Sequence, residues 1–127
     1  GTSARICKSA INELREEGYK VGMIRPITIS PFPYASFEKL SDNVKCVIDV
    51  EMSVPAQMVL DVRVGVKGRF LIEEITTAGG IILKGSNVKA RIRELAERNR
   101  RWRKYIRSRR AWRIPHLDIA LDACIQP

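Results

Sequence analysis

The sequence predicts an α/β domain in which an open, mostly parallel sheet lies between two layers of helices. The 127 residues are enough for one domain with a modest core. Hydrophobic residues account for 45% and charged residues for 29% of the chain, which is typical of folded proteins and not of disordered ones. Segments with helical and strand periodicity alternate along the chain, which is the order of a sheet with right-handed crossovers.

The first predicted helix lies at the start of the chain. Thr2 or Ser3 can cap it, and Gly18 is a natural stop. Its apolar residues recur at i, i+3, i+4 and i+7: Cys7, Ala10, Ile11 and Leu14. This spacing predicts one buried face.

A strand and a loop are predicted next. The run Lys20–Ile24 is typical of a short strand, which ends at Arg25 because Pro26 disfavours further pairing. The segment ITISPFP then predicts a loop with an extended backbone fixed by proline. A short helix is expected at Ser36–Leu40.

Two further strands enclose another helix. The β-branched run Val44–Val50 predicts a strand buried on both faces of a parallel sheet, and Phe70–Ile75 predicts a third strand. A glycine turn with Gly79 and Gly80 follows. Between these strands, Pro55 suits the first turn of a helix. One face of this helix holds four apolar residues: Met58, Val59, Val62 and Val66.

The start of the chain departs from this pattern. A domain of this type should begin with a strand, whereas Gly1 falls in what has the pattern of the loop after it. We therefore expect that the first strand is missing and that the chain is a fragment, or a subunit whose start is incomplete.

The net charge of +9 is concentrated in the last third of the chain. Residues 1–87 contain 11 Lys and Arg against 10 Asp and Glu, whereas residues 88–127 contain 12 against 4. The sequence therefore predicts an α/β domain over 1–87 and a long basic helix with a tail over 88–127. The apolar stripe of this helix consists of Val88, Ile92, Leu95, Asn99, Trp102 and Ile106.

Three interpretations of the basic segment stay open. The helix can be solvated or pack against the domain or a partner, it can be an abnormal end produced by a shift of reading frame, or it can bind nucleic acid. Aromatic residues that stack on bases would be expected on the basic face, whereas Trp102 lies on the apolar stripe. Packing is therefore favoured, and we do not expect nucleic acid as a partner.

Nothing in the sequence predicts export or membrane insertion. No stretch approaches the roughly 20 apolar residues that cross a bilayer, and the first ten residues lack the pattern of a signal peptide. Cys7, Cys46 and Cys124 are too widely spaced for a disulfide framework or a metal motif. We expect reduced thiols, with Cys7 and Cys46 as small buried hydrophobes, and a cytoplasmic protein.

Two catalytic motifs can be excluded. In the segment GIILKGS, Lys84 precedes Gly85, whereas the lysine of a phosphate-binding P-loop follows the second glycine. We therefore interpret Ser86 as a helix cap. His116 is the only histidine, and no Ser, Cys or acidic residue stands at a recognisable catalytic spacing from it. We predict no metal site in this chain.

The segment GTSARICKSAINELREEGYKVGMIRPITISPFP and the later CVIDVEMSVPAQMVLDVRVGVKGR together resemble a known family. They are similar to the C-terminal, transketolase-C-like domain of the alpha subunit of 2-oxoacid:ferredoxin oxidoreductases, over residues 1 to about 69. The RPIT and PFP loop and the VEMS stretch are most similar to the branched-chain type, which acts on 2-oxoisovalerate.

The resemblance implies an assembly that oxidatively decarboxylates a 2-oxoacid. Such an assembly uses thiamine diphosphate with magnesium, passes electrons through iron-sulfur clusters to ferredoxin, and transfers the acyl group to coenzyme A. The family places these cofactors on other domains and subunits. The resemblance therefore implies that this chain holds none of them, is inactive alone, and acts as a structural docking domain. The alternative function is a basic nucleic-acid-binding module on an α/β scaffold.

Ligands and interfaces of open α/β sheets usually lie at the carboxyl ends of the strands. The candidate residues there are Thr2, Ser3, Arg25, Pro26, Phe32, Glu51, Ser53, Gln57, Gly79 and Gly80. For four of them a structural role is the favoured interpretation: capping at Thr2 and Ser3, an ion pair at Arg25, and a bond to a backbone amide at Glu51.

One segment departs from the family pattern. Where the family would have a glycine before the Gln–Met pair, this chain has Val54, Pro55 and Ala56, with one residue more. We expect this insertion to shift the start of the following helix, and with it the positions of Ser53 and Gln57.

Overall fold

The computed structural model describes the fold of residues 1–108 and the side chains of residues 1–101. Four helices and two strands follow one another in these residues: α1 (Thr2–Glu16), α2 (Tyr34–Glu38), β1 (Cys46–Glu51), α3 (Val59–Val66), β2 (Leu71–Thr76) and α4 (Gly85–Ser108). The predictions for His116, Cys124 and the side chains of Trp102 and Ile106 fall outside the described residues. None of the helices in the described part is long and apolar enough to cross a membrane.

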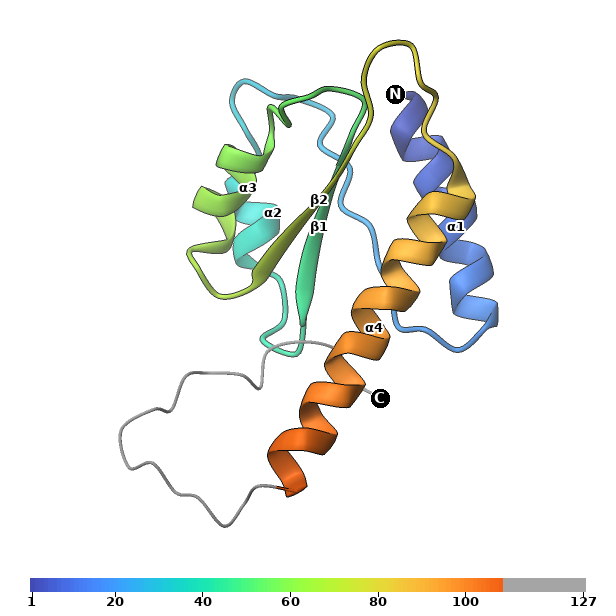
Figure 1. Cartoon of the computed structure of the whole chain (residues 1–127). Coiled ribbons are helices and arrows are strands. Elements are labelled where there is room, and N and C mark those ends of the chain that lie inside the picture. Colours follow the sequence, from blue (N-terminus) through green and yellow to red (C-terminus); the bar gives the residue numbers. More distant parts are fainter. Residues whose placement is uncertain (109–127) are drawn as a thin grey trace.

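The two strands are parallel neighbours and form the middle layer. Their register runs from Cys46 opposite Leu71 to Glu51 opposite Thr76. Figure 1 shows α1 and α4 on one side of this sheet and α2 with α3 on the other. The crossover through α3 and the helices on both faces confirm the predicted open, parallel, three-layer α/β fold.

The core on the α1 side is formed by residues of the first helix and residues at or just before the start of the last helix. Cys7, Ala10 and Ile11 of α1 pack with Leu83 and with Val88 of α4. This cluster also contacts partly buried residues of the sheet, of α4 and of the segment after α1: Val50, Ile75, Ile92 and Val21. The helical spacing therefore identified the buried face of α1 and the inner stripe of α4. Whether 1–87 and 88–127 are separate units stays a prediction.

The core on the α2 side is built around phenylalanine. Phe32, Phe37 and Phe70 form a buried cluster with Val62 and Val66 of α3. The rings of Phe32 and Phe37 stack with centroids 5.4 Å apart. Gly65 allows α2 to approach α3, because a Cβ atom there would lie 3.0 Å from Cβ of Phe37.

The strand predicted at Lys20–Ile24 is absent, so the described sheet has two strands where three were expected. The segment is extended and runs toward the carboxyl end of the sheet (Figure 1). Val21 packs on the α1 core, but its carbonyl accepts a 2.8 Å hydrogen bond from Nε of Arg15 and not from a neighbouring strand. Within the segment only Val21 is partly buried, whereas Met23 and Ile24 are exposed, so the apolar pattern predicted neither the pairing nor the burial of most of it.

Several predicted element ends were wrong. Gly1 is the N-cap of α1, without a side-chain cap, so Thr2 and Ser3 lie inside the helix. Ser86 likewise lies within α4, after Gly85. Helix ends depend on local backbone geometry that periodicity does not report. Gly18, with φ of +89°, does follow the end of α1 as predicted.

Two details of β1 and α3 also differ from expectation. The helix predicted to have Pro55 in its first turn starts later, because α3 begins at Val59. Whether the insertion at Val54–Ala56 shifts this helix relative to the family stays a prediction. β1 is only partly buried along most of its length, and its two most buried residues are the acids Asp49 and Glu51. The prediction of a strand buried on both faces by apolar side chains was therefore wrong, because the buried side chains are acidic.

Candidate functional site at the carboxyl edge of the sheet

Several predicted site segments meet at one end of the sheet. Figure 1 shows the N-terminus of α1, the loop before α2, the β1–α3 loop and the β2–α4 loop at the end where both strands finish. The backbone N–H of Thr77 donates to the carbonyl of Glu51 over 3.2 Å, which joins the last two loops. We call this end the carboxyl edge.

Glu51 organises the β1–α3 loop. One carboxylate oxygen accepts hydrogen bonds from the Ser53 hydroxyl at 2.9 Å and the Gln57 N–H at 3.1 Å. The other accepts the Met58 N–H at 2.6 Å. These two amides immediately precede α3, so the buried carboxylate satisfies donors at a helix start that has no local cap. The predicted role as a partner of backbone amides is what the geometry supports.

Asp49 lies two residues before Glu51 on the same face of β1, and only 6% of it is exposed. Burial, followed by a hydrogen bond with Glu51 and repulsion from Glu51 and Glu74, raises the pKa of Asp49 to about 7. Burial also acts on Glu51, but the bonds from Asp49, Gln57, Met58 and Ser53 together lower its pKa. Below about pH 7, Asp49 therefore carries a proton while the neighbouring Glu51 is charged.

Two polar atoms of this region are buried without a hydrogen-bond partner among the described residues, Oδ2 of Asp49 and Oγ1 of Thr77. Asp49 lies on the face toward α2 and α3, with Val47, whereas Thr77 follows the end of β2. Neither residue was identified from the sequence. Asp49 could have been noticed in the sequence, because it is an acidic residue inside a β-branched run.

The other predicted residues differ in exposure. Arg25 and Gln57 are exposed, whereas Pro26 and Ser53 are half-buried. Phe32 is 7% exposed, so its side chain fills the core between α2 and α3. The prediction of these residues as ligand contacts stays a prediction.

Gly79 and Gly80 form the predicted turn after β2. Both have positive φ, 65° and 78°, which explains glycine at these positions. The turn carries the chain from the sheet toward α4, and the N–H of Ile81 donates to the carbonyl of Ala78 at 3.2 Å.

The apolar side chains of the edge loops were not identified as a group from the sequence. Six of them are exposed: Ile27, Ile29, Met52, Val54, Ile81 and Ile82. The sequence could have indicated them, because these apolar residues stand in segments that proline and glycine identify as loops. Such residues are unusual on the surface of an isolated soluble domain when they gather at one end.

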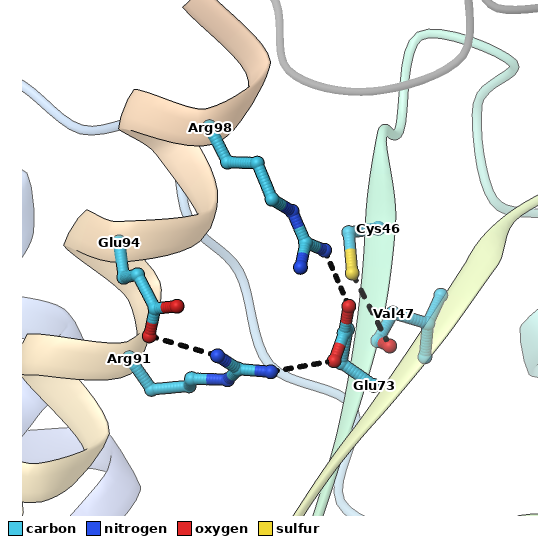
Figure 2. Close-up of polar contacts among 6 residues, drawn as sticks. All are labelled: Cys46, Val47, Glu73, Arg91, Glu94 and Arg98. Atoms are coloured by element: carbon cyan, nitrogen blue, oxygen red, sulfur yellow. Dashed lines mark hydrogen bonds and ion pairs between the residues drawn. The ribbon is translucent and has the colours of Figure 1, made fainter.

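The basic helix α4 contains a second polar centre that sequence reasoning missed. Glu73 of β2 accepts a hydrogen bond from Arg91 at 2.8 Å and another from Arg98 at 2.5 Å (Figure 2). The bond from Arg98, together with that from Arg91, lowers the pKa of Glu73. Figure 2 also shows Arg91 bridging to Glu94 on its own helix and Cys46 donating to the Val47 carbonyl.

Further ion pairs join α4 to α1. Lys89 pairs with Glu13, and Arg93 pairs with Glu17 at 2.5 Å. Arg100 pairs with Glu97 within α4. A substantial part of the basic charge on α4 therefore faces acids of the same domain, which supports packing of this helix against the domain.

Of the two cysteines predicted to be buried in the described part, only Cys7 is buried. Cys7 is buried, and burial raises the pKa of its thiol. Cys46 is partly buried. Among the described residues, no group of three His, Cys, Asp or Glu side chains is arranged to hold a metal ion.

The fold and its edge define an α/β domain with a clamped loop, a buried acid pair and exposed apolar loops. Residues 1–90 match the family described as pyruvate:ferredoxin oxidoreductase core domain II. The chain therefore belongs to this family, which confirms the predicted relationship to 2-oxoacid:ferredoxin oxidoreductases. The match extends beyond Arg69, where the resemblance in the sequence became faint.

Two curated relatives are similar over 96 residues. The ketoisovalerate oxidoreductase subunit VorB of Methanothermobacter marburgensis is 36% identical, and that of Methanothermobacter thermautotrophicus is 38% identical. The aligned part covers 76% of this chain but 27% of each relative, so the chain spans about a quarter of their length. No solved structure matches the chain significantly.

Proposed function

We propose that this chain is a docking domain of a 2-oxoacid:ferredoxin oxidoreductase that acts on 2-oxoisovalerate. The observation that carries this proposal is the identity of 36–38% to two ketoisovalerate oxidoreductase subunits over 96 residues. The geometry supports a docking role, because the hydrogen bonds of Glu51 go to its own loop and Asp49 is buried. Neither acid is presented to a substrate.

We assign the domain to the alpha subunit, where it corresponds to the transketolase-C-like portion. The full enzyme is a cytoplasmic complex of several subunits with ferredoxin as electron acceptor. It converts the 2-oxoacid and coenzyme A to acyl-coenzyme A and carbon dioxide, and the two electrons leave through iron-sulfur clusters. The isolated chain has no activity in this proposal.

The described residues do not fit the cofactors of such an enzyme. The loops of the carboxyl edge offer no exposed carboxylate for magnesium diphosphate, because Asp49 and Glu51 are buried. Cys7 and Cys46 lie in separate elements, whereas an iron-sulfur cluster needs several converging thiolates. This supports our proposal that thiamine diphosphate, magnesium and the clusters are held by other parts of the complex, and we propose the same for coenzyme A.

The test is purification of the oxidoreductase from its source, followed by identification of its polypeptides. We expect this sequence in the active complex, either as a separate chain or within a longer subunit. The complex should reduce ferredoxin with 2-oxoisovalerate faster than with pyruvate, and the isolated chain should reduce none. An active complex without this sequence would refute the proposal.

A further inference from the structure

The carboxyl edge presents apolar side chains to solvent. Ile27 is 90% exposed and Ile29 is 65% exposed in the loop before α2. Val54 is 61% exposed in the β1–α3 loop, and Ile81 and Ile82 are each 66% exposed in the β2–α4 loop. These loops finish at one end of the sheet (Figure 1). Leaving this apolar area in water is unfavourable, which indicates a surface that another protein covers.

The charges of the same loops have one sign. Segments 22–33, 52–58 and 77–84 contain no Asp or Glu, but they contain Arg25 and Lys84. Both cations are exposed, and neither forms an ion pair with another residue of the described part. The arrangement differs from that of α4, where Lys89, Arg91 and Arg93 pair with acids of α1 and β2.

Two of these loops are held in place without a partner. Glu51 fixes the β1–α3 loop through Ser53, Gln57 and Met58, and Thr77 bonds to the Glu51 carbonyl. A surface that is already ordered loses less conformational entropy when it binds, so more of its apolar burial contributes to affinity. The edge is therefore suited to a stable contact.

We infer that the carboxyl edge is the docking surface for a neighbouring domain of the same oxidoreductase, whose matching surface is apolar with carboxylates opposite Arg25 and Lys84. This inference rests on the proposed function. The chain spans 27% of the length of its relatives, so the larger part of such a protein is available to cover the edge. Charge complementarity favours an acidic rim on that partner.

The outer face of α3 provides a matched control surface. Leu60 is 69% exposed and Val64 is 61% exposed, which is close to the exposure of Ile82. The cation between them, Arg63, pairs with Glu74 of β2 at 3.3 Å. This face therefore has apolar residues but no cation left for a partner, and we expect it to stay outside the contact.

The experiment titrates this chain onto the oxidoreductase assembly purified without it, with the dissociation constant measured by calorimetry. Ile82→Asp should raise the dissociation constant at least tenfold, whereas Leu60→Asp should change it less than twofold. Melting temperatures of both variants should equal that of the unsubstituted chain, because both side chains are exposed. Lys84→Glu should also weaken binding, with a smaller effect at high salt.

The outcomes separate the two proposals. If the unsubstituted chain does not bind the assembly, the proposed function fails and the inference fails with it. If it binds and Ile82→Asp binds equally well, or if Leu60→Asp causes the larger loss, the docking surface lies elsewhere while the proposed function stands.

Discussion

The two faces of the sheet bury acidic side chains in opposite ways. On the face toward α4, Glu73 meets the guanidinium groups of Arg91 and Arg98, and its pKa is lowered by them. On the face toward α3, Asp49 has the carboxyl groups of Glu51 and Glu74 as its charged neighbours, and burial raises its pKa to about 7. One acid is kept charged by cations, and the other is kept neutral by its surroundings.

This difference explains why a strongly basic helix belongs to an otherwise neutral domain. Arg91, Arg98, Lys89 and Arg93 bring positive charge to acids on β2 and α1, which are far from them in the sequence. On the α3 side, the Glu51 carboxylate is stabilised by hydrogen bonds from backbone amides and not by cations. The charge of α4 is thus in part internal to the fold, and it is not by itself evidence for nucleic acid.

The largest expected effect comes from detaching α4 from its face of the sheet. Ile92 is partly buried against the α1 core, so Ile92→Asp would place a carboxylate among apolar side chains. We expect a loss of about 3 kcal/mol in the free energy of unfolding, seen as a lower melting temperature. Ala90→Asp is the control, because Ala90 is exposed on the same helix. An equal melting temperature for both variants would contradict the packing of α4.

The next effect concerns the pH dependence of stability on the α3 face. The folded pKa of Asp49, about 7, lies above its ordinary value of 3.8. The stability contributed by the protonated acid is therefore complete below about pH 4 and is lost as the pH rises to about 7. Glu51 acts in the opposite sense, because its pKa is lowered and its contribution is lost only in more acidic solution.

Asp49→Asn tests this assignment. The unsubstituted chain should lose about 1.4 kcal/mol of stability per pH unit between pH 5 and 7, and the variant should lose this slope. Urea unfolding at several pH values measures it. Asp42→Asn is the control, because the Asp42 side chain is 91% exposed. A slope that survives Asp49→Asn would show that another group titrates.

The parts of the fold that the sequence predicted are those with a strong local pattern. The spacing of Cys7, Ala10, Ile11 and Leu14 gave the buried face of α1, and all four are buried. The strands predicted at Val44–Val50 and Phe70–Ile75 match β1 and β2 within two residues at each end. The resemblance of the first 69 residues gave the family, because it rests on extended segments and not on single motifs.

The remaining features depend on contacts between distant residues. Lys20–Ile24 has a strand-like pattern, but pairing requires a partner that the pattern does not contain. Glu73 and Arg98 are 25 residues apart, and no periodicity connects them. The loops of the carboxyl edge were predicted from the parallel order of the strands, whereas the burial of Phe32 and the proton on Asp49 arise only when α2 and α3 cover the sheet.

The smallest expected loss of stability comes from Glu73, the acid on the α4 face of the sheet. Glu73→Gln removes the charge that Arg91 and Arg98 share, and the Glu73 side chain is only 18% exposed. We expect a loss of about 1–2 kcal/mol, because charge-assisted hydrogen bonds in a partly buried site contribute more than surface pairs. Glu17→Gln breaks a comparable Arg pair whose two side chains are each 40% exposed, and it should cost clearly less because solvent screens that pair. If the two losses, measured by urea unfolding, are equal, the cations of α4 act only as surface charge, and the distinction between the two faces rests on Asp49 alone.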